Sequence, residues 1–186
     1  MQPRLLVVLI AVTVVAVGAG AIVQGQGTKT SPYVDASGAI ALPDPAMVRA
    51  RWAYLGSWTV IGDDAAESVH TVYTQPGSIE RFRATGVFPD GAVLVKEVRE
   101  AETAAMTTGE VARSGAMIQW FVMIKDGHSS HEGNPLWGKG WGWALFLADD
   151  PPTNVATDYS SDCLPCHVPA EKNDWVYTEG YPVLHE

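Results

Sequence analysis

Residues 92–99 have the sequence Ala92-Val93-Leu94-Val95-Lys96-Glu97-Val98-Arg99. Valine favours extended backbone, and successive side chains of a strand point to opposite faces of a sheet. Lys96 would then lie on an apolar face, together with Ala92, Leu94 and Val98. Glu97 and Arg99 would lie on the other face, beside two valines. This run therefore predicts a strand that turns a lysine toward an apolar surface, where an ammonium group is costly unless it is paired or consumed by reaction.

Other stretches have a similar composition and are bounded by Gly, Pro, Asp or Asn, namely Trp58–Ile61, Val69–Thr74, Met117–Lys125 and Gly142–Leu147. Two segments have helical signals instead. Asp44-Pro45 is typical of a helix start and leads into a short segment that ends near Trp52. Residues 76–85 are followed by Gly86, a common residue after the end of a helix. We therefore expect a mainly β (α+β) fold, an antiparallel sheet with a few helices.

The N-terminus has the features of an export segment. Residues 1–23 begin with Met1-Gln2-Pro3-Arg4 and continue as an apolar run. This pattern predicts either a cleaved signal peptide or an uncleaved N-terminal membrane anchor. Residues 24–43 are rich in Gly, Gln, Ser, Thr and Pro, which predicts a linker, and residues 44–186 remain as one folded domain. We expect this domain in the periplasm or at the outer face of the cytoplasmic membrane.

The net charge of the chain restricts its partners. A formal charge of -9 at pH 7 disfavours nucleic acid and anionic lipid surfaces. Membrane contact is then expected only through the N-terminal segment. Small molecules and basic redox proteins remain as partners.

One motif carries recognisable chemistry, the sequence Cys163-Leu164-Pro165-Cys166-His167. Its pattern, C-x-x-C-H, is the attachment signature of c-type haem. Two thiols one helical turn apart can form thioethers with the two vinyl groups, and the next residue presents an imidazole to the iron. The chain has two cysteines, and this motif uses both. We therefore expect one covalent haem c per chain, held by Cys163 and Cys166, with His167 as the iron ligand.

Three other interpretations of these cysteines remain. They could form a redox disulfide, although no thioredoxin-like βαβ pattern precedes them. They could bind zinc together with His128 and His131, which would leave His167 without a role. A structural disulfide would be strained at this spacing within a helix. A ligand on the opposite face of the iron would have to come from upstream, where the methionine candidates are Met106, Met117 and Met123.

Two further clusters have plainer interpretations. Trp137, Trp141 and Trp143 lie among glycines, and we expect aromatic packing in the core. Asp149-Asp150-Pro151-Pro152 is typical of a surface turn.

At this point the chain resembles the cytochrome P-460 family, a group that also contains the cytochromes c′-β. The matching segments agree in order and spacing, and they include His70-Thr71-Val72-Tyr73, Val95-Lys96-Glu97, Gly140-Trp141-Gly142-Trp143, the haem motif and Asp174-Trp175-Val176-Tyr177. The resemblance implies a mainly β fold, usually a homodimer, with one five-coordinate haem that is open on its distal side.

The resemblance also suggests roles for three residues. In hydroxylamine-oxidising members a lysine is cross-linked to the haem macrocycle, and Lys96 stands at the matching position. His70 stands in the place of a distal arginine, and Phe121 in the place of a carboxylate that handles protons. An apolar distal wall is the feature that the resemblance associates with the c′-β branch, which binds nitric oxide.

Two functional hypotheses follow. The first is an exported mono-haem c enzyme that oxidises hydroxylamine or a related small nitrogen compound and passes electrons to a redox partner protein. Lys96 would modify the haem, and His70 would accept a proton, because the ordinary pKa of histidine lies near neutrality. The second is a non-enzymatic c′-β-like protein that binds nitric oxide or transfers electrons. Lys96 favours the enzyme, and Phe121 favours the binding protein.

Overall fold

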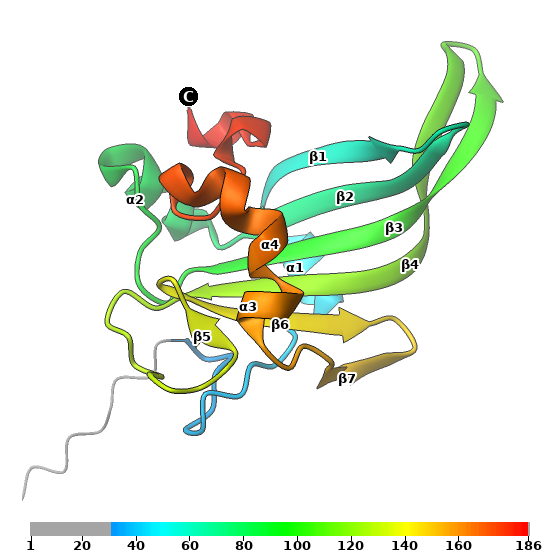
Figure 1. Cartoon of the computed structure of the whole chain (residues 1–186). Helices are drawn as coiled ribbons and strands as arrows, with labels where there is room; N and C mark the ends of the chain where they lie inside the picture. The colour runs from blue at the N-terminus through cyan, green and yellow to red at the C-terminus, as the bar shows by residue number, and fades with distance from the viewer. Residues whose placement is uncertain (1–30, 186) are drawn as a thin grey trace, which may run out of the picture.

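The computed structural model describes residues 31–185, which are built around one seven-stranded antiparallel sheet (Figure 1). Strands β1 to β6 pair in the order β1-β2-β3-β4-β6-β5, and β7 pairs with β6. The strands are β1 (Ala53–Ile61), β2 (Ala66–Thr74), β3 (Val93–Met106), β4 (Gly109–Lys125), β5 (Trp137–Gly138), β6 (Trp141–Leu147) and β7 (Asp150–Asn154). The mainly β fold with an antiparallel sheet and a few helices is confirmed.

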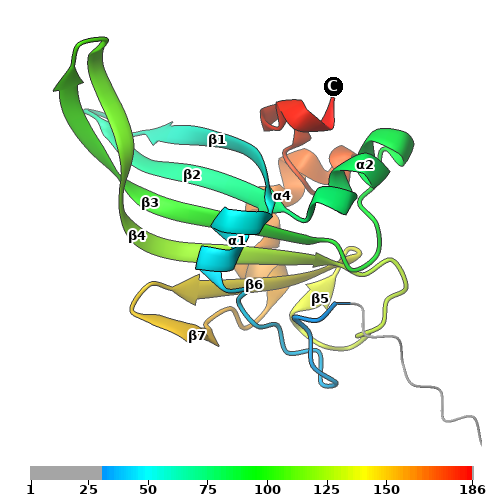
Figure 2. The same cartoon turned by 180° about the vertical axis from the view of Figure 1, so that it is seen from behind.

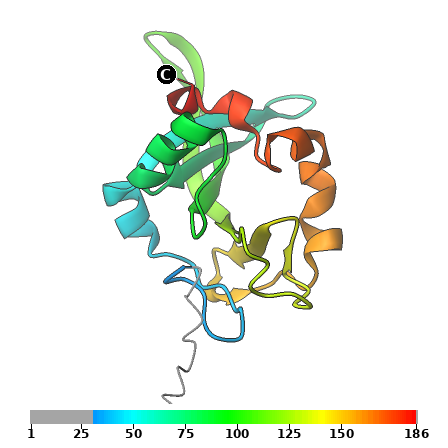
Figure 3. The same cartoon turned by 90° about the vertical axis from the view of Figure 1, so that its left-hand side faces the viewer.

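The helices lie on both sides of this sheet. They are α1 (Pro45–Arg51), α2 (Pro76–Thr85), α3 (Tyr159–Asp162) and α4 (Leu164–His167), followed by the 3-10 helices η1 (Val168–Asn173), η2 (Thr178–Gly180) and η3 (Pro182–Leu184). Figure 2 shows α1 against one face, and Figure 3 shows the α3 and α4 segment on the opposite side. Each face of the sheet is therefore covered by its own apolar layer.

Both predicted helices form, and their ends have the expected chemistry. The carboxylate of Asp44 accepts a hydrogen bond from the Ala46 amide at 2.8 Å, and Pro45 occupies the first turn of α1. Gly86 ends α2 with φ 74°, a left-handed conformation that glycine adopts without steric cost.

The strands β3 and β4 are much longer than their sequence patterns predict. Their outer halves pair only with each other, from Ala101↔Ser114 to Met106↔Gly109, and this hairpin projects beyond the rest of the sheet (Figure 1). The residues concerned are mostly Ala, Glu and Thr, which do not form the apolar alternation of a half-buried strand. Cross-strand hydrogen bonds extend these strands where the hydrophobic pattern ends.

The prediction of a surface turn at residues 149–152 is wrong for most of these residues. The turn itself consists of Ala148 and Asp149, and Asp150–Asn154 forms the strand β7. Two prolines fit there because β7 lies at the edge of the sheet, where a missing amide hydrogen costs no ladder bond.

The described residues upstream of α1 pack against the domain. Val34 and Ile40 form an isolated antiparallel bridge, and both are buried in the apolar layer on the α1 side. Folded structure thus begins before Asp44, within the range that composition assigns to a linker. The predicted export segment, residues 1–23, lies outside the described residues. Within residues 31–185, no helix is long and apolar enough to cross a membrane.

A buried carboxylate connects α1 to the sheet. Glu97 is 3% exposed and forms an ion pair with Arg49 of α1. Trp120 donates an indole hydrogen bond at 3.3 Å to the same Oε1 atom that pairs with Arg49, and the other oxygen, Oε2, lies 3.8 Å from Nε of Arg99. Burial of a carboxylate is tolerated here because several donors replace its lost water.

We expect Glu97→Gln to lower the free energy of unfolding by about 2 kcal/mol, because it leaves the partly buried arginines without their counter-charge. Urea unfolding followed by tryptophan fluorescence would measure the change. Glu102→Gln is the matched control, since Glu102 pairs with Arg113 at 3.0 Å on the exposed hairpin. The control should cost less than about 0.5 kcal/mol. Equal losses in the two variants would contradict a structural role for the buried pair.

Candidate functional site

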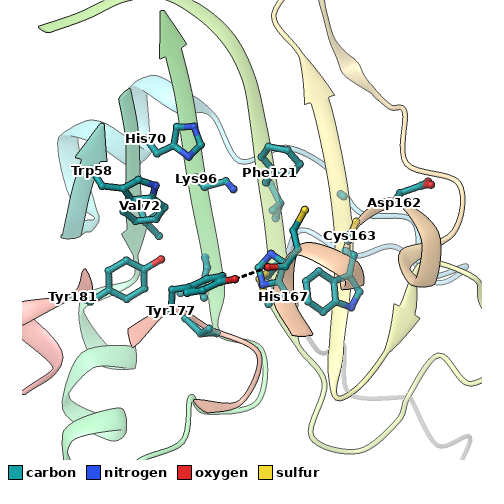
Figure 4. Close-up of a pocket in the computed structure, with 17 residues that line it drawn as sticks. Trp58, His70, Val72, Lys96, Phe121, Asp162, Cys163, His167, Tyr177 and Tyr181 are labelled. Atoms are coloured by element: carbon teal, nitrogen blue, oxygen red, sulfur yellow. Dashed lines mark hydrogen bonds between the residues drawn. The ribbon is translucent and has the colours of Figure 1, made fainter. Parts of the chain in front are cut away.

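A cavity of about 360 Å³ lies between the sheet and the α3 and α4 segment (Figure 4). The sheet contributes His70 from β2, Lys96 from β3 and Phe121 from β4, and the helical side contributes Cys163, Cys166 and His167. The structure thus brings together all six site residues predicted from the sequence. Most other lining residues are apolar or aromatic, among them Trp58, Val72, Leu94, Met123, Trp143, Ala144, Val176, Tyr177 and Tyr181.

The two cysteines and the histidine are held on one short helical turn. Cys163 is the N-cap of α4, and Cys166 and His167 are its last residues. Pro165 fits in the first turn, where the helix needs no amide donor. The Cys163 amide donates to the Tyr159 carbonyl at 3.1 Å and joins α4 to α3. The local chain thus presents both thiols and the imidazole toward the same cavity.

Both cysteines are free thiols. Burial, supported by the charge of Asp162, raises the pKa of Cys163 to about 11. A thiol with such a high pKa carries little thiolate at neutral pH, so Cys163 is not itself an activated nucleophile.

The His167 ring is fixed by one strong hydrogen bond. Its Nδ1 lies 2.7 Å from the Trp175 carbonyl oxygen. A carbonyl can only accept, so Nδ1 carries the proton and Nε2 keeps its lone pair. Burial lowers the pKa of His167, although the bond to Trp175 opposes that shift. Trp143 packs edge-on against the ring with 4.9 Å between centroids. This is the tautomer and support that a metal-binding imidazole requires.

Lys96 points into the cavity, as the alternation of its strand predicts (Figure 4). Its register partner on β4 is Phe121, and Nζ lies 4.2 Å from the centre of the Phe121 ring. No described carboxylate forms an ion pair with Lys96. Burial lowers the pKa of its amine, and the two cysteines oppose that shift. Within the described residues, the Lys96 amine in the cavity therefore contacts the aromatic face of Phe121.

His70 lies on the same wall, with Nε2 3.0 Å from the Ser68 hydroxyl and its ring 5.6 Å from Trp58. Burial, together with the positive charge of Lys96, lowers the pKa of His70 to about 4. The imidazole is consequently neutral at pH 7, with one ring nitrogen able to accept a proton.

The zinc interpretation finds no support in residues 31–185, where no three His, Cys, Asp or Glu side chains gather closely enough to hold a metal ion. His131 packs against Trp137 instead, with 4.2 Å between ring centroids and the rings tilted by 41°. Of the three methionine candidates, Met123 lines the cavity, Met106 is exposed at the hairpin tip and Met117 packs on the opposite face.

Sequence reasoning missed several residues that shape the site. Tyr177 lines the cavity and donates a hydrogen bond to the Cys166 carbonyl at 2.6 Å. Trp143 belongs to the core, as expected, and also contacts His167. Tyr181 packs beside Trp58 at 6.1 Å. The matching segments given above include Tyr177, but no local signal assigned either tyrosine a role.

Two thiols and an imidazole with a free Nε2 match the donors that a c-type haem requires, and they face an apolar cavity on a β-sheet scaffold. Residues 49–178 match the model of the family described as Cytochrome P460. The chain belongs to the cytochrome P-460 family, and membership implies a haem cofactor. A comparison with curated proteins gives no match.

The lowered pKa of His70 predicts a pH effect on stability. Between pH 6.5 and about 4 the unfolded chain binds a proton at His70 that the folded protein does not bind. Stability should therefore decrease as the pH falls through this window. Partial exposure of the ring makes the effect modest.

Urea unfolding at several pH values would measure it, with His70→Gln as the variant. We expect the variant to lose less stability than the wild type between pH 6.5 and 4. His128→Gln, a change in a loop outside the cavity, serves as control and should follow the wild type. Parallel curves for His70→Gln and the wild type would contradict the shift.

Proposed function

We propose that this chain is an exported mono-haem c protein that oxidises hydroxylamine or a related small nitrogen compound at an open distal iron site. The observation that carries the proposal is the convergence of a neutral imidazole, His70, and the Lys96 amine, which forms no ion pair within residues 31–185, on the cavity that also receives His167. The apolar run of residues 1–23 supports export. The family resemblance supports a homodimer and one haem per chain.

The residues present fit a covalent haem c. Cys163 and Cys166 would form the two thioethers, and Nε2 of His167 would ligate the iron. Bound haem would supply an iron that binds the nitrogen compound and accepts its electrons. The mostly apolar lining suits a flat, largely apolar macrocycle and limits the access of water.

The protein's own contribution to the reaction is proton transfer and positioning. Oxidation of hydroxylamine to nitroxyl releases two electrons and two protons, NH2OH → HNO + 2 H⁺ + 2 e⁻. His70 accepts a proton from the substrate, because its ring faces the cavity and has an unprotonated nitrogen at working pH, although burial makes it a weaker base than an ordinary histidine. The electrons leave to an external one-electron acceptor, a redox partner protein. Lys96 is the candidate for a cross-link to the macrocycle, since its amine lies inside the cavity and no carboxylate of the described residues pairs with it.

A second candidate function rests on Phe121. Its ring contributes an apolar surface to the cavity at the position where the resemblance places a proton-handling carboxylate. A wall of this kind favours a small neutral ligand over a substrate that must lose protons. The alternative is therefore a c′-β-like protein that binds nitric oxide or transfers electrons without catalysis.

The role of Lys96 can be tested on the purified, haem-loaded protein by absorption spectroscopy and intact mass. We expect intact mass to show haem bonded to a lysine as well as to the two cysteines, and we expect a red-shifted Soret band in the absorption spectrum. Lys96→Ala should abolish both features and leave the thioether-bound haem. Lys172→Ala, a change at an exposed lysine of η1, should retain the red shift. An ordinary high-spin haem c spectrum in the wild type would contradict the cross-link.

The proton-accepting role of His70 predicts a kinetic effect. His70→Gln should lower the rate of hydroxylamine oxidation about 100-fold or more, the usual contribution of a positioned general base. Anaerobic assays with a soluble one-electron acceptor would measure kcat, and nitric oxide titration would show that the iron site is intact. Unchanged kcat would exclude His70 as the base. Wild-type protein that binds nitric oxide and does not oxidise hydroxylamine would support the c′-β-like alternative.

A further inference from the structure

The carbonyl that accepts the orienting hydrogen bond of His167 lies in a backbone segment with an unusual conformation. The acceptor is the Trp175 carbonyl, and Asp174 and Trp175 have φ values of 58° and 66°. Non-glycine residues rarely adopt this left-handed conformation, and each costs of the order of 1 kcal/mol. Two such residues in sequence persist only where surrounding contacts hold them.

Three contacts hold this turn. Lys125 donates to the Asp174 carboxylate through Nζ at 2.7 Å, and the Trp141 indole donates to the Asp174 carbonyl at 2.9 Å. The Trp175 amide donates to the Ala170 carbonyl at 3.0 Å. The Lys125 side chain is 10% exposed and its Nζ lies 4.8 Å from the centre of the Trp141 ring. The segment is thus fixed from the sheet, through side chains at the ends of β4 and β6.

The carboxylate of Asp174 depends on this lysine. Its Oδ2 atom is buried and has no hydrogen-bond partner among residues 31–185. The ammonium of Lys125 is the described cation that balances its charge. Loss of the lysine would leave a partly buried carboxylate, 21% exposed, without its counter-charge, which is unfavourable. The turn would then have to move toward solvent and carry the Trp175 carbonyl with it.

We propose that Lys125 and Asp174 are positioning residues for His167. Their ion pair holds the left-handed Asp174-Trp175 turn, and that turn places the carbonyl that accepts the Nδ1 proton of His167. A strong bond at Nδ1 makes the imidazole a better electron donor at Nε2 and keeps its orientation constant. The ion pair would therefore adjust the electron density at a bound iron from a distance, without touching the haem. In its effect on iron, this inference rests on the proposed haem site.

Two readouts test it in Lys125→Met, which keeps the aliphatic stem against Trp141 and removes the charge. In protein labelled with ¹⁵N-histidine, the Nδ1 proton of His167 should exchange with solvent about tenfold faster than in the wild type, as expected when a hydrogen bond of typical strength weakens. In the haem-loaded protein the reduction potential should shift to more positive values, because a weaker donor stabilises ferric iron less. The iron–histidine stretching frequency should decrease.

Lys139→Met is the matched control, because Nζ of Lys139 lies 5.4 Å from the centre of the Trp175 ring and the described ion pair of Asp174 is with Lys125. It removes the same charge and should leave both readouts near the wild type. Lys125→Arg should restore them, since it can keep the ion pair. Asp174→Asn is a second variant that tolerates the left-handed conformation, and it should shift both readouts in the same direction as Lys125→Met.

Proton exchange and potential that stay at wild-type values in both Lys125→Met and Asp174→Asn would overturn the proposal. Equal shifts in Lys139→Met would do the same, because they would indicate a general effect of charge. The exchange measurement needs no haem. A wild-type protein without haem would therefore contradict the proposed function, while the exchange rates would still decide whether the ion pair positions His167.

Discussion

The central sheet is buried on both faces, and the alternation of β3 keeps the two buried layers apart. Val93 and Val95 pack toward α1, whereas Leu94 and Lys96 face the cavity. The neighbouring strands follow this alternation, since Lys96 pairs with Val72 on β2 and with Phe121 on β4. The wall of the cavity that faces α4 is therefore set by one strand and its two partners. The burial of Val93 and Val95 in the apolar layer beneath α1 is therefore what turns Lys96 toward the cavity.

The two walls of the cavity are built by different means. The sheet wall uses side-chain alternation, which places Phe121 over Lys96 at a fixed distance. The helical wall uses a short turn and a backbone carbonyl, which together fix the His167 ring. Strand β4 connects the two, because it carries Phe121 in the cavity and Lys125 at the turn behind His167. One strand thus contributes to the sheet wall of the cavity and to the support of His167 on the helical wall.

Much of this arrangement can be predicted from the sequence, because its signals are local. Alternation predicts the inward Lys96, capping residues predict α1 and α2, and the spacing of the motif predicts three residues of the site. The outer half of the β3–β4 hairpin could not be predicted, since its residues have no hydrophobic period and depend on cross-strand pairing. The Asp174-Trp175 turn was also missed, because neither residue type indicates a left-handed backbone. Lys125 and Asp174 are 49 residues apart, and neither local sequence indicates that their side chains pair.

Lys96 and Glu97 are neighbours with opposite charges on opposite sides of the sheet, which bears on how β3 finds its partners. Its valines and leucine would suit either apolar layer, so hydrophobicity alone tolerates a slip of one residue. Such a slip reverses the direction of every side chain. The Glu97 carboxylate would then enter the cavity, and the Lys96 ammonium would face Arg49 and Arg99 without a counter-charge. The adjacent opposite charges of Lys96 and Glu97 therefore favour a single register of β3.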